Sequence, residues 1–296
     1  MNETAPDPPS LAVNQHSSGA QPPPLQNGDS DSDSLRSLCA SLHSQITAFL
    51  QEDVPTETLR AVQAQTKKSL AIIQQALDRY PLPSLSLSYN GGKDCLVLLI
   101  LYLSLLPTHP ALPSALPAIY IPPSHPFDTV TAFTLASAHK YHLRLDIHAN
   151  DDEDGDPQMA GKGQGQGGGA AMKEAFAQYL ARNPGVEAIF VGTRRTDPHG
   201  GKLSGEGFDV TDGGWPRFMR VHPVIEWHYV EVWAFLRHLK IPYCKLYDLG
   251  YTSLGGTNDT HPNPALRVEG PPGGVVPYRP AYELEEDREE RLGRDW

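Results

Sequence analysis

Residues 88–94 carry the clearest chemical signal in the sequence and read Ser-Tyr-Asn-Gly-Gly-Lys-Asp. Adjacent glycines let the main chain adopt unusual dihedral angles and approach a ligand closely. A helix is expected to begin directly after them, where unpaired N–H groups and the helix dipole favour anions. Because Lys93 adds a positive charge, the pattern predicts a phosphate-binding loop, although not a Walker A loop. The alternative is a tight turn in which Asp94 caps the helix.

A second polar group follows a buried strand expected at residues 186–191. From Gly192 the sequence continues Gly-Thr-Arg-Arg-Thr-Asp-Pro. Ligands of open α/β sheets bind outside the carboxyl ends of the strands. Arg194 and Arg195, followed by Thr196 and Asp197, are therefore placed to contact phosphates and the edge of a heterocycle. The alternative is a solvated pair of arginines in a surface turn.

The elements that must position these residues follow from hydrophobic periodicity. Residues 35–49, and a second segment between Pro55 and Pro81, predict two amphipathic packing helices. Strands and helices then alternate, which predicts an α/β fold with a mostly parallel sheet and right-handed crossovers. The expected strands are residues 85–89, 118–121, 143–148 and 186–191, and the expected helices are residues 94–106, 127–141, 172–181 and 228–239.

Two segments have a composition that disfavours a packed core. Residues 1–34 are rich in proline and end in an acidic, serine-rich run, so we expect a disordered tail that is either a plain linker or regulatory. Residues 151–169 are acidic and then glycine-rich, and we expect a flexible insertion at a sheet edge. Their glycines do not follow a strand and no Lys-Ser/Thr closes them, which argues against a phosphate loop.

Overall composition excludes several classes of function. The chain has 296 residues and a formal net charge of −11, which argues against non-specific nucleic-acid binding. Its three cysteines form no C-x-x-C pair, so neither a zinc knuckle nor a thiol redox centre is indicated. The N-terminus lacks the features of a signal peptide, and the longest apolar run, residues 96–106, is too short to cross a bilayer. We expect a cytoplasmic protein without a membrane partner.

The loop at residues 88–94 resembles the pyrophosphate-binding loop of the adenine nucleotide α-hydrolase-like superfamily. That group includes phosphoadenosine phosphosulfate (PAPS) reductases, ATP sulfurylase small subunits and eukaryotic-type FAD synthases, and Asn at the third position is nearest to the FAD synthases. Residues 215–227, 250–256 and 279–294 resemble FAD synthases in the same order, so the resemblance spans about residues 35–294. It implies a Rossmann-like three-layer fold with N-terminal helices and a C-terminal tail.

Cysteine placement separates the FAD synthases from the reductases. The sulfonucleotide reductases carry Cys after their Gly-Tyr-x-Ser-Ile-Gly element and a nucleophilic Cys near the C-terminus. In this chain residues 255–259 are Gly-Gly-Thr-Asn-Asp, and no cysteine follows Cys244. Without a thiolate, thiol-dependent reduction has no nucleophile.

The resemblance therefore implies an FMN adenylyltransferase, which transfers AMP from ATP to FMN with Mg²⁺ and releases FAD and pyrophosphate. We expect one domain over residues 35–296, in which residues 270–296 cover the substrate, and a monomeric protein. Because the FMN phosphate is already an anion, positioning and charge neutralisation should provide most of the catalysis. The alternatives are an ATP pyrophosphatase or adenylyltransferase acting on another substrate, and a non-catalytic flavin- or nucleotide-binding module.

The expected site residues fall into four sets. Those for ATP and its phosphates are Ser88, Tyr89, Asn90, Gly91, Gly92, Lys93 and Arg194, with Tyr120, Ile121 and Pro122 bordering adenine. Those that the resemblance assigns to FMN are Arg195, Thr196, Asp197, Asp212, Trp215, Arg220, Arg291 and Arg294. The expected catalytic residues are Asn90, Lys93, Asp94, Arg194 and Arg291. Asp94 is also the candidate to orient a water molecule bound to Mg²⁺.

Overall fold

The structure is a computed structural model that describes residues 28–148, 167–198, 200–269 and 277–295. Its centre is a six-stranded sheet with the order β3-β2-β1-β4-β6-β5, in which β5 is antiparallel to β6 and all other neighbours are parallel. The strands are β1 (Leu85–Ser88), β2 (Leu116–Tyr120), β3 (Leu143–Ile147), β4 (Ala188–Phe190), β5 (Phe208–Val210) and β6 (Met219–Val221). The expected α/β class with a mostly parallel sheet is confirmed.

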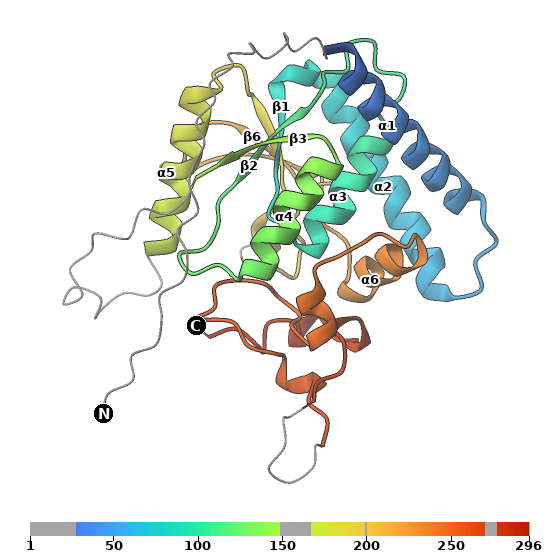
Figure 1. Cartoon of the computed structure of the whole chain (residues 1–296), viewed down its shortest axis with the longest axis vertical. Helices are drawn as coiled ribbons and strands as arrows, with labels where there is room; N and C mark the ends of the chain where they lie inside the picture. Colours follow the sequence, from blue (N-terminus) through green and yellow to red (C-terminus); the bar gives the residue numbers. More distant parts are fainter. Residues whose placement is uncertain (1–27, 149–166, 199, 270–276, 296) are drawn as a thin grey trace, which may run out of the picture.

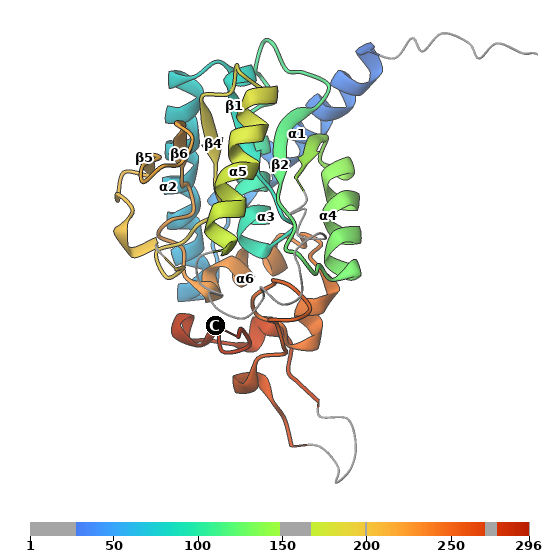
Figure 2. The same ribbon diagram turned by 90° about the vertical axis from the view of Figure 1, so that its left-hand side faces the viewer.

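Helices cover both faces of the sheet and give three layers. Figures 1 and 2 show α5 on one face, with α3 and α4 on the other. This placement follows from right-handed crossovers, because the chain moves outward from β1 to β3 and then returns through α5 to β4. The helices are α1 (Gly28–Gln51), α2 (Glu57–Arg79), α3 (Lys93–Ser104), α4 (Asp128–Lys140), α5 (Gly167–Arg182) and α6 (Tyr229–His238).

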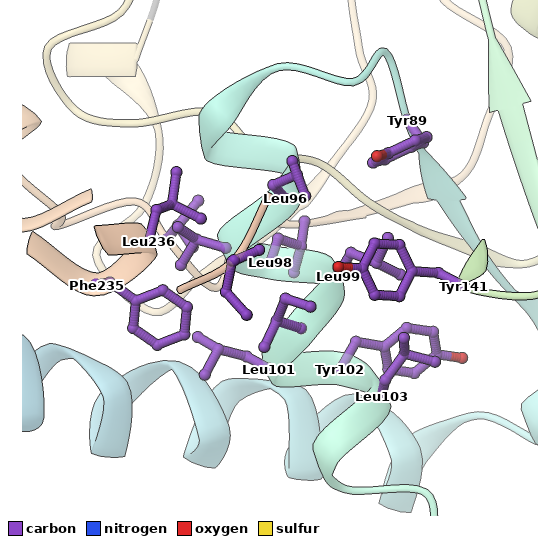
Figure 3. Close-up of a cluster of buried hydrophobic side chains, with 14 of the residues drawn as sticks. Tyr89, Leu96, Leu98, Leu99, Leu101, Tyr102, Leu103, Tyr141, Phe235 and Leu236 are labelled. Atoms are coloured by element: carbon purple, nitrogen blue, oxygen red, sulfur yellow. The ribbon is translucent and has the colours of Figure 1, made fainter. Parts of the chain in front are cut away.

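Helix α3 is the centre of the hydrophobic core. Every residue from Leu96 to Leu103 is buried, because the helix packs against α1, α2 and α6 as well as lying on the sheet. Figure 3 shows Leu98 and Leu101 near Phe235 and Leu236 of α6, and Leu99 near the ring of Tyr141. A helix that is apolar on all sides requires such enclosure. The start of α3, which immediately follows the predicted phosphate loop, is thereby held in a fixed position.

Two expected boundaries were wrong where the structure describes them. Helix α1 begins at Gly28, so residues 28–34 are helical and do not belong to a disordered tail. A polar composition predicts little burial, but it does not by itself exclude a helical turn. Similarly, residues 167–169 form the first turn of α5. The rest of both segments, residues 1–27 and 149–166, lies outside the described residues.

After α6 the chain forms a loop-rich C-terminal segment with short 3₁₀ turns, described over residues 239–269 and 277–295. Figures 1 and 2 show this orange and red segment beneath one end of the sheet, next to α6. Hydrogen bonds hold its last part: Asn263 donates to the carbonyl of Glu289 at 2.7 Å, and His261 N–H to that of Gly293 at 2.8 Å. No helix among the described residues combines the length and apolar character needed to span a membrane.

Candidate active site

The predicted phosphate loop connects β1 to α3. Gly91 has φ +71°, and a Cβ atom placed on it would lie 2.4 Å from Oγ1 of Thr134 in α4. Only glycine fits both this left-handed conformation and this close approach. Thr134 in turn donates its hydroxyl hydrogen to the carbonyl of Asn90 at 3.1 Å. The loop is therefore held against α4 at Asn90 and Gly91.

The first amides of α3 are capped by two side chains rather than left bare. Gly92 N–H donates to Oδ1 of Asn90 at 2.9 Å, and Lys93 N–H donates to the hydroxyl of Tyr247 at 3.0 Å. Both capping residues line the cavity described next. Because their oxygens accept from the helix, the Asn90 side-chain NH₂ group and the Tyr247 O–H hydrogen are the groups that can donate to an anion.

A cavity of about 440 Å³ lies in front of the loop, at the carboxyl ends of β1, β2 and β4. Its volume lies within the usual range of roughly 300–1,000 Å³ for small-molecule sites. The expected residues that line it are Ser88, Asn90, Gly92, Lys93, Asp94, Tyr120, Ile121, Asp197 and Arg291. The sequence motifs from the loop, the second strand, the fourth strand and the C-terminus therefore meet at one site.

Beside the cavity, four charged side chains form what we call the buried charge cluster: Lys93, Asp94, Arg194 and Glu290. Lys93 Nζ lies 2.5 Å from Glu290 Oε1 and 3.0 Å from Asp94 Oδ2. Arg194 Nε lies 2.7 Å from Asp94 Oδ1, and its guanidinium also pairs with the second oxygen of Glu290. Arg194 also lies 3.5 Å from Oδ1 of Asp287. These oppositely charged groups pair with one another in a largely buried region, where unpaired charges are costly.

The cluster keeps Lys93 and Asp94 ionised. Burial by itself would lower the pKa of Lys93, but the carboxylates of Asp94 and Glu290 outweigh this effect and the net shift is upward. Burial would raise the pKa of Asp94, whereas the charges of Arg194 and Lys93 lower it below its ordinary value. At neutral pH these two residues therefore carry full, mutually compensated charges.

Several expected site residues do not reach the cavity. The side chain of Tyr89 is fully buried and its hydroxyl bonds Ser137 of α4 at 2.7 Å, so it belongs to the core. Arg194 has no solvent exposure and stands behind Asp94 and Glu290 rather than in the cavity wall. Arg195 points away and binds Glu226 and the carbonyl of Leu203 at 2.7 Å. Gly91, Pro122, Thr196, Asp212 and Arg220 are also not among the lining residues.

Trp215 and Arg294 lie one layer behind the cavity wall. The Trp215 ring lies 5.9 Å from that of Phe176, a residue of α5 that lines the cavity. The Arg294 guanidinium packs so closely on Gly255 that a Cβ atom there would approach it to 2.4 Å. Arg294 also pairs with Asp259 at 3.0 Å. Both residues therefore shape the site through a neighbour in this structure.

The expectations for individual residues missed two groups that the structure places at the site. Tyr247 caps Lys93 from a 3₁₀ turn, Lys245–Leu249, and Glu290 completes the buried charge cluster from the C-terminal segment. Glu290 stands directly before Arg291 in the terminal motif, which is the signal that could have drawn attention to it. Tyr247 has no comparable local signal, because its role arises only from packing.

A metal ligand set is not evident within the described ranges, where no group of three or more His, Cys, Asp and Glu side chains is arranged to hold an ion. The two carboxylate oxygens of Asp94 face Lys93 Nζ and Arg194 Nε. Asp197 accepts from Arg194 N–H at 2.8 Å and from Arg291 at 3.1 Å. Glu290, the third carboxylate that lines the cavity, pairs with Lys93 and Arg194, so all three are engaged by cations or amides of the chain.

Comparison with known proteins agrees with this geometry. Residues 84–262 match the phosphoadenosine phosphosulfate reductase domain family. The chain is 37% identical over 259 residues to a probable FAD synthase of Schizosaccharomyces pombe, with 86% of this chain and 88% of that protein covered. It is similar in structure to Candida glabrata FMN adenylyltransferase in complex with FAD and inorganic pyrophosphate, with TM-score 0.74, 28% identity and coverage of 89% of this chain and 99% of that one.

A second structure of the Candida glabrata enzyme, in complex with FMN and the ATP analog AMPCPP, gives a TM-score of 0.73 at 28% identity and the same coverage, 89% and 99%. The fold and the family match define an α/β protein with the phosphoadenosine phosphosulfate reductase domain. Within that family, the chain belongs to the FAD synthases.

Proposed function

We propose that this chain is an FMN adenylyltransferase, which transfers AMP from ATP to FMN and releases FAD and pyrophosphate. The observation that carries the proposal is the single cavity that joins the phosphate loop to Asp197 and Arg291. One wall can hold the phosphates of ATP, and the other offers a carboxylate and a guanidinium to a second, anionic substrate. The similarity to enzymes solved with FMN, an ATP analog and FAD supports the same pair of substrates.

The reaction requires little proton chemistry from the protein. An oxygen of the FMN phosphate attacks the α-phosphorus of ATP, a new P–O bond forms, and the bond to the β-phosphate oxygen breaks. The electron pair leaves with pyrophosphate, and no proton has to be removed from the nucleophile. Positioning and electrostatic stabilisation are therefore the main tasks of the residues around the cavity.

Each part of the cavity has a role under this proposal. The NH₂ group of Asn90 and the hydroxyl of Tyr247 donate to the β- and γ-phosphates at the N-terminus of α3. Arg291 neutralises charge on the FMN phosphate, and Asp197 accepts a hydrogen bond from the flavin ring. Lys93 and Arg194 support the loop electrostatically from behind, because both are already paired with carboxylates.

We further propose that Mg²⁺ enters the site together with ATP. The carboxylates of Asp94 and Asp197 already have cationic or amide partners, and Mg²⁺ commonly binds through substrate phosphates, waters and only one or two carboxylates. When bound, the ion would reduce repulsion between the two anionic substrates.

We also propose that the enzyme acts as a monomer in the cytoplasm. The cytoplasmic location agrees with its three free cysteines.

The direct test is turnover of the purified protein with ATP, Mg²⁺ and FMN, followed by chromatographic separation of FMN and FAD. We expect FAD and pyrophosphate in equal amounts, and no product when riboflavin, which lacks the phosphate nucleophile, replaces FMN. EDTA should abolish turnover and added Mg²⁺ should restore it. Release of pyrophosphate without FAD would instead indicate a different acceptor, and tight FMN binding without turnover would indicate a binding module.

A further inference from the structure

The terminal charged residues pair with a loop that is far away in the sequence. Glu290 binds the side chain of Arg194, while the next residue, Arg291, binds Asp197 at 3.1 Å. Asp197 also accepts the backbone N–H of Arg194 at 2.8 Å. Two ion pairs of opposite polarity therefore join residues 290–291 to the loop that follows β4. The two pairs differ in burial, since the Glu290 side chain is only 5% exposed whereas that of Arg291 is 31% exposed.

Glu290 is fixed more strongly than a surface ion pair requires. Its carboxylate also binds Lys93 Nζ at 2.5 Å, which connects it to the phosphate loop. Its backbone carbonyl accepts the hydroxyl of Thr252 at 2.5 Å, and Asn263 donates to that hydroxyl at 2.8 Å. Residue 290 is thus held through both its side chain and its main chain, at a point where three separate segments meet.

Resting on the proposed function, we propose that Glu290 is a positioning residue that holds Arg291 in the cavity for contact with FMN. A buried ion pair is seldom retained for stability alone, because desolvation offsets much of the Coulombic gain. Here the pair fixes the main chain immediately before a half-exposed arginine that lines the substrate cavity. Without this anchor, Arg291 would lose conformational entropy each time FMN binds, and this loss would weaken binding.

The proposal is tested by a double-mutant cycle with Glu290→Gln and Arg291→Ala, measured as steady-state KM for FMN and for ATP. Losing a charge-assisted hydrogen bond of about 1.5–3 kcal/mol corresponds to a rise of about 10- to 150-fold in KM for FMN, and we expect each single variant to fall in that range. If Glu290 acts through Arg291, the double variant should match the single Arg291→Ala variant within about threefold, because coupled residues are not additive. Multiplication of the two effects would overturn the proposal.

Two readouts separate positioning from a general loss of structure. Glu290→Gln leaves an additional net positive charge beside the phosphate loop, so KM for ATP should stay constant or fall; a parallel rise in both KM values would contradict the proposal. Hydrogen exchange of residues 284–295 should be faster in Glu290→Gln than in the matched control Glu285→Gln, which changes an exposed carboxylate. Equal exchange in the two variants would also overturn it.

If Glu290→Gln does not fold, Thr252→Val provides the second variant. It removes the hydrogen bond to the Glu290 carbonyl but leaves the buried charge cluster intact. We expect a rise in KM for FMN in the same direction, about three- to tenfold, with KM for ATP unchanged. A wild-type protein that forms no FAD would refute the proposed function, whereas normal FMN kinetics in Thr252→Val and Glu290→Gln would refute only this inference.

Discussion

Replacing Gly91 by alanine tests whether the phosphate loop has to pass as close to α4 as the structure shows. At φ +71° an alanine residue would be strained by about 1–2 kcal/mol. The new Cβ would also lie 2.4 Å from Thr134 Oγ1, so the loop or the helix would have to move. Overpacking of this kind costs about 1–3 kcal/mol. Allowing about 0.5 kcal/mol for the stiffer unfolded chain, Gly91→Ala should lower the free energy of unfolding by about 2–4 kcal/mol.

The loss of activity should be larger than the loss of stability suggests. A shift of about 1 Å in the loop would displace the phosphates of ATP from the groups that bind them, and misplacement of this size costs about 100-fold in rate. The assays are urea unfolding and the kcat/KM for ATP at saturating FMN. If Gly91→Ala kept wild-type kcat/KM for ATP, the loop would not hold the phosphates.

Two further variants separate the destabilisation caused by backbone strain at Gly91 from that caused by steric overlap with Thr134. Gly213 has φ +59° but no atom within 4 Å of an added Cβ, so Gly213→Ala reports the dihedral strain without the overlap. Thr134→Ala removes the overlapping oxygen, and the double variant should therefore be less impaired than the sum of the two single variants. Equal destabilisation of Gly91→Ala and Gly213→Ala would refute the close packing against α4.

Three other expectations follow from particular side chains. Burial lowers the pKa of His222 to about 4, so as the pH falls the unfolded state takes up a proton near pH 6.5, before the folded state does. The free energy of unfolding should therefore fall by about 3 kcal/mol as the pH drops from about 6.5 to about 4. The His222→Phe variant should lose this dependence when urea unfolding is measured over the same pH range. Tyr247→Phe keeps the ring packing but removes the hydroxyl, and should raise KM for ATP about tenfold in steady-state assays, whereas an unchanged KM would exclude a phosphate contact. Arg195→Gln should change KM for FMN by less than about twofold, since its guanidinium binds Glu226 outside the cavity; a tenfold rise would contradict the structure.

The central part of the fold could be predicted because its strands and helices are buried on most sides. β2 and β4 are continuous runs of buried residues, and β1 is buried except at its last residue, Ser88, which is typical of parallel strands covered on both faces. β5 and β6 could not be predicted. Each has three residues, too few to show a period, and their pairing places Asp209 opposite Arg220, which only the folded register reveals.

In the site too, features that depend on neighbouring residues could be predicted from the sequence, whereas contacts between distant residues could not. The glycine turn before α3 was predictable because glycine conformation and helix polarity act within a few residues. Tyr89 and Arg195 turn away from the cavity for one reason. Neighbours in an extended chain or a turn point in different directions, so a motif does not place all its members on one side. Glu290 lies 197 positions from Lys93, and no local pattern indicates that the two would meet.

The buried charge cluster also changes how attraction for the substrates must be explained. From the sequence, Lys93 and Arg194 were two cations for the phosphates, but Asp94 and Glu290 neutralise them in the structure. The chain carries a formal net charge of −11, so long-range attraction for ATP and FMN is also weak. Under the proposed function, binding therefore depends on short-range donors that face the cavity, on Arg291, and on the Mg²⁺ that we propose to enter with ATP. The cluster contributes by fixing the distances between these groups.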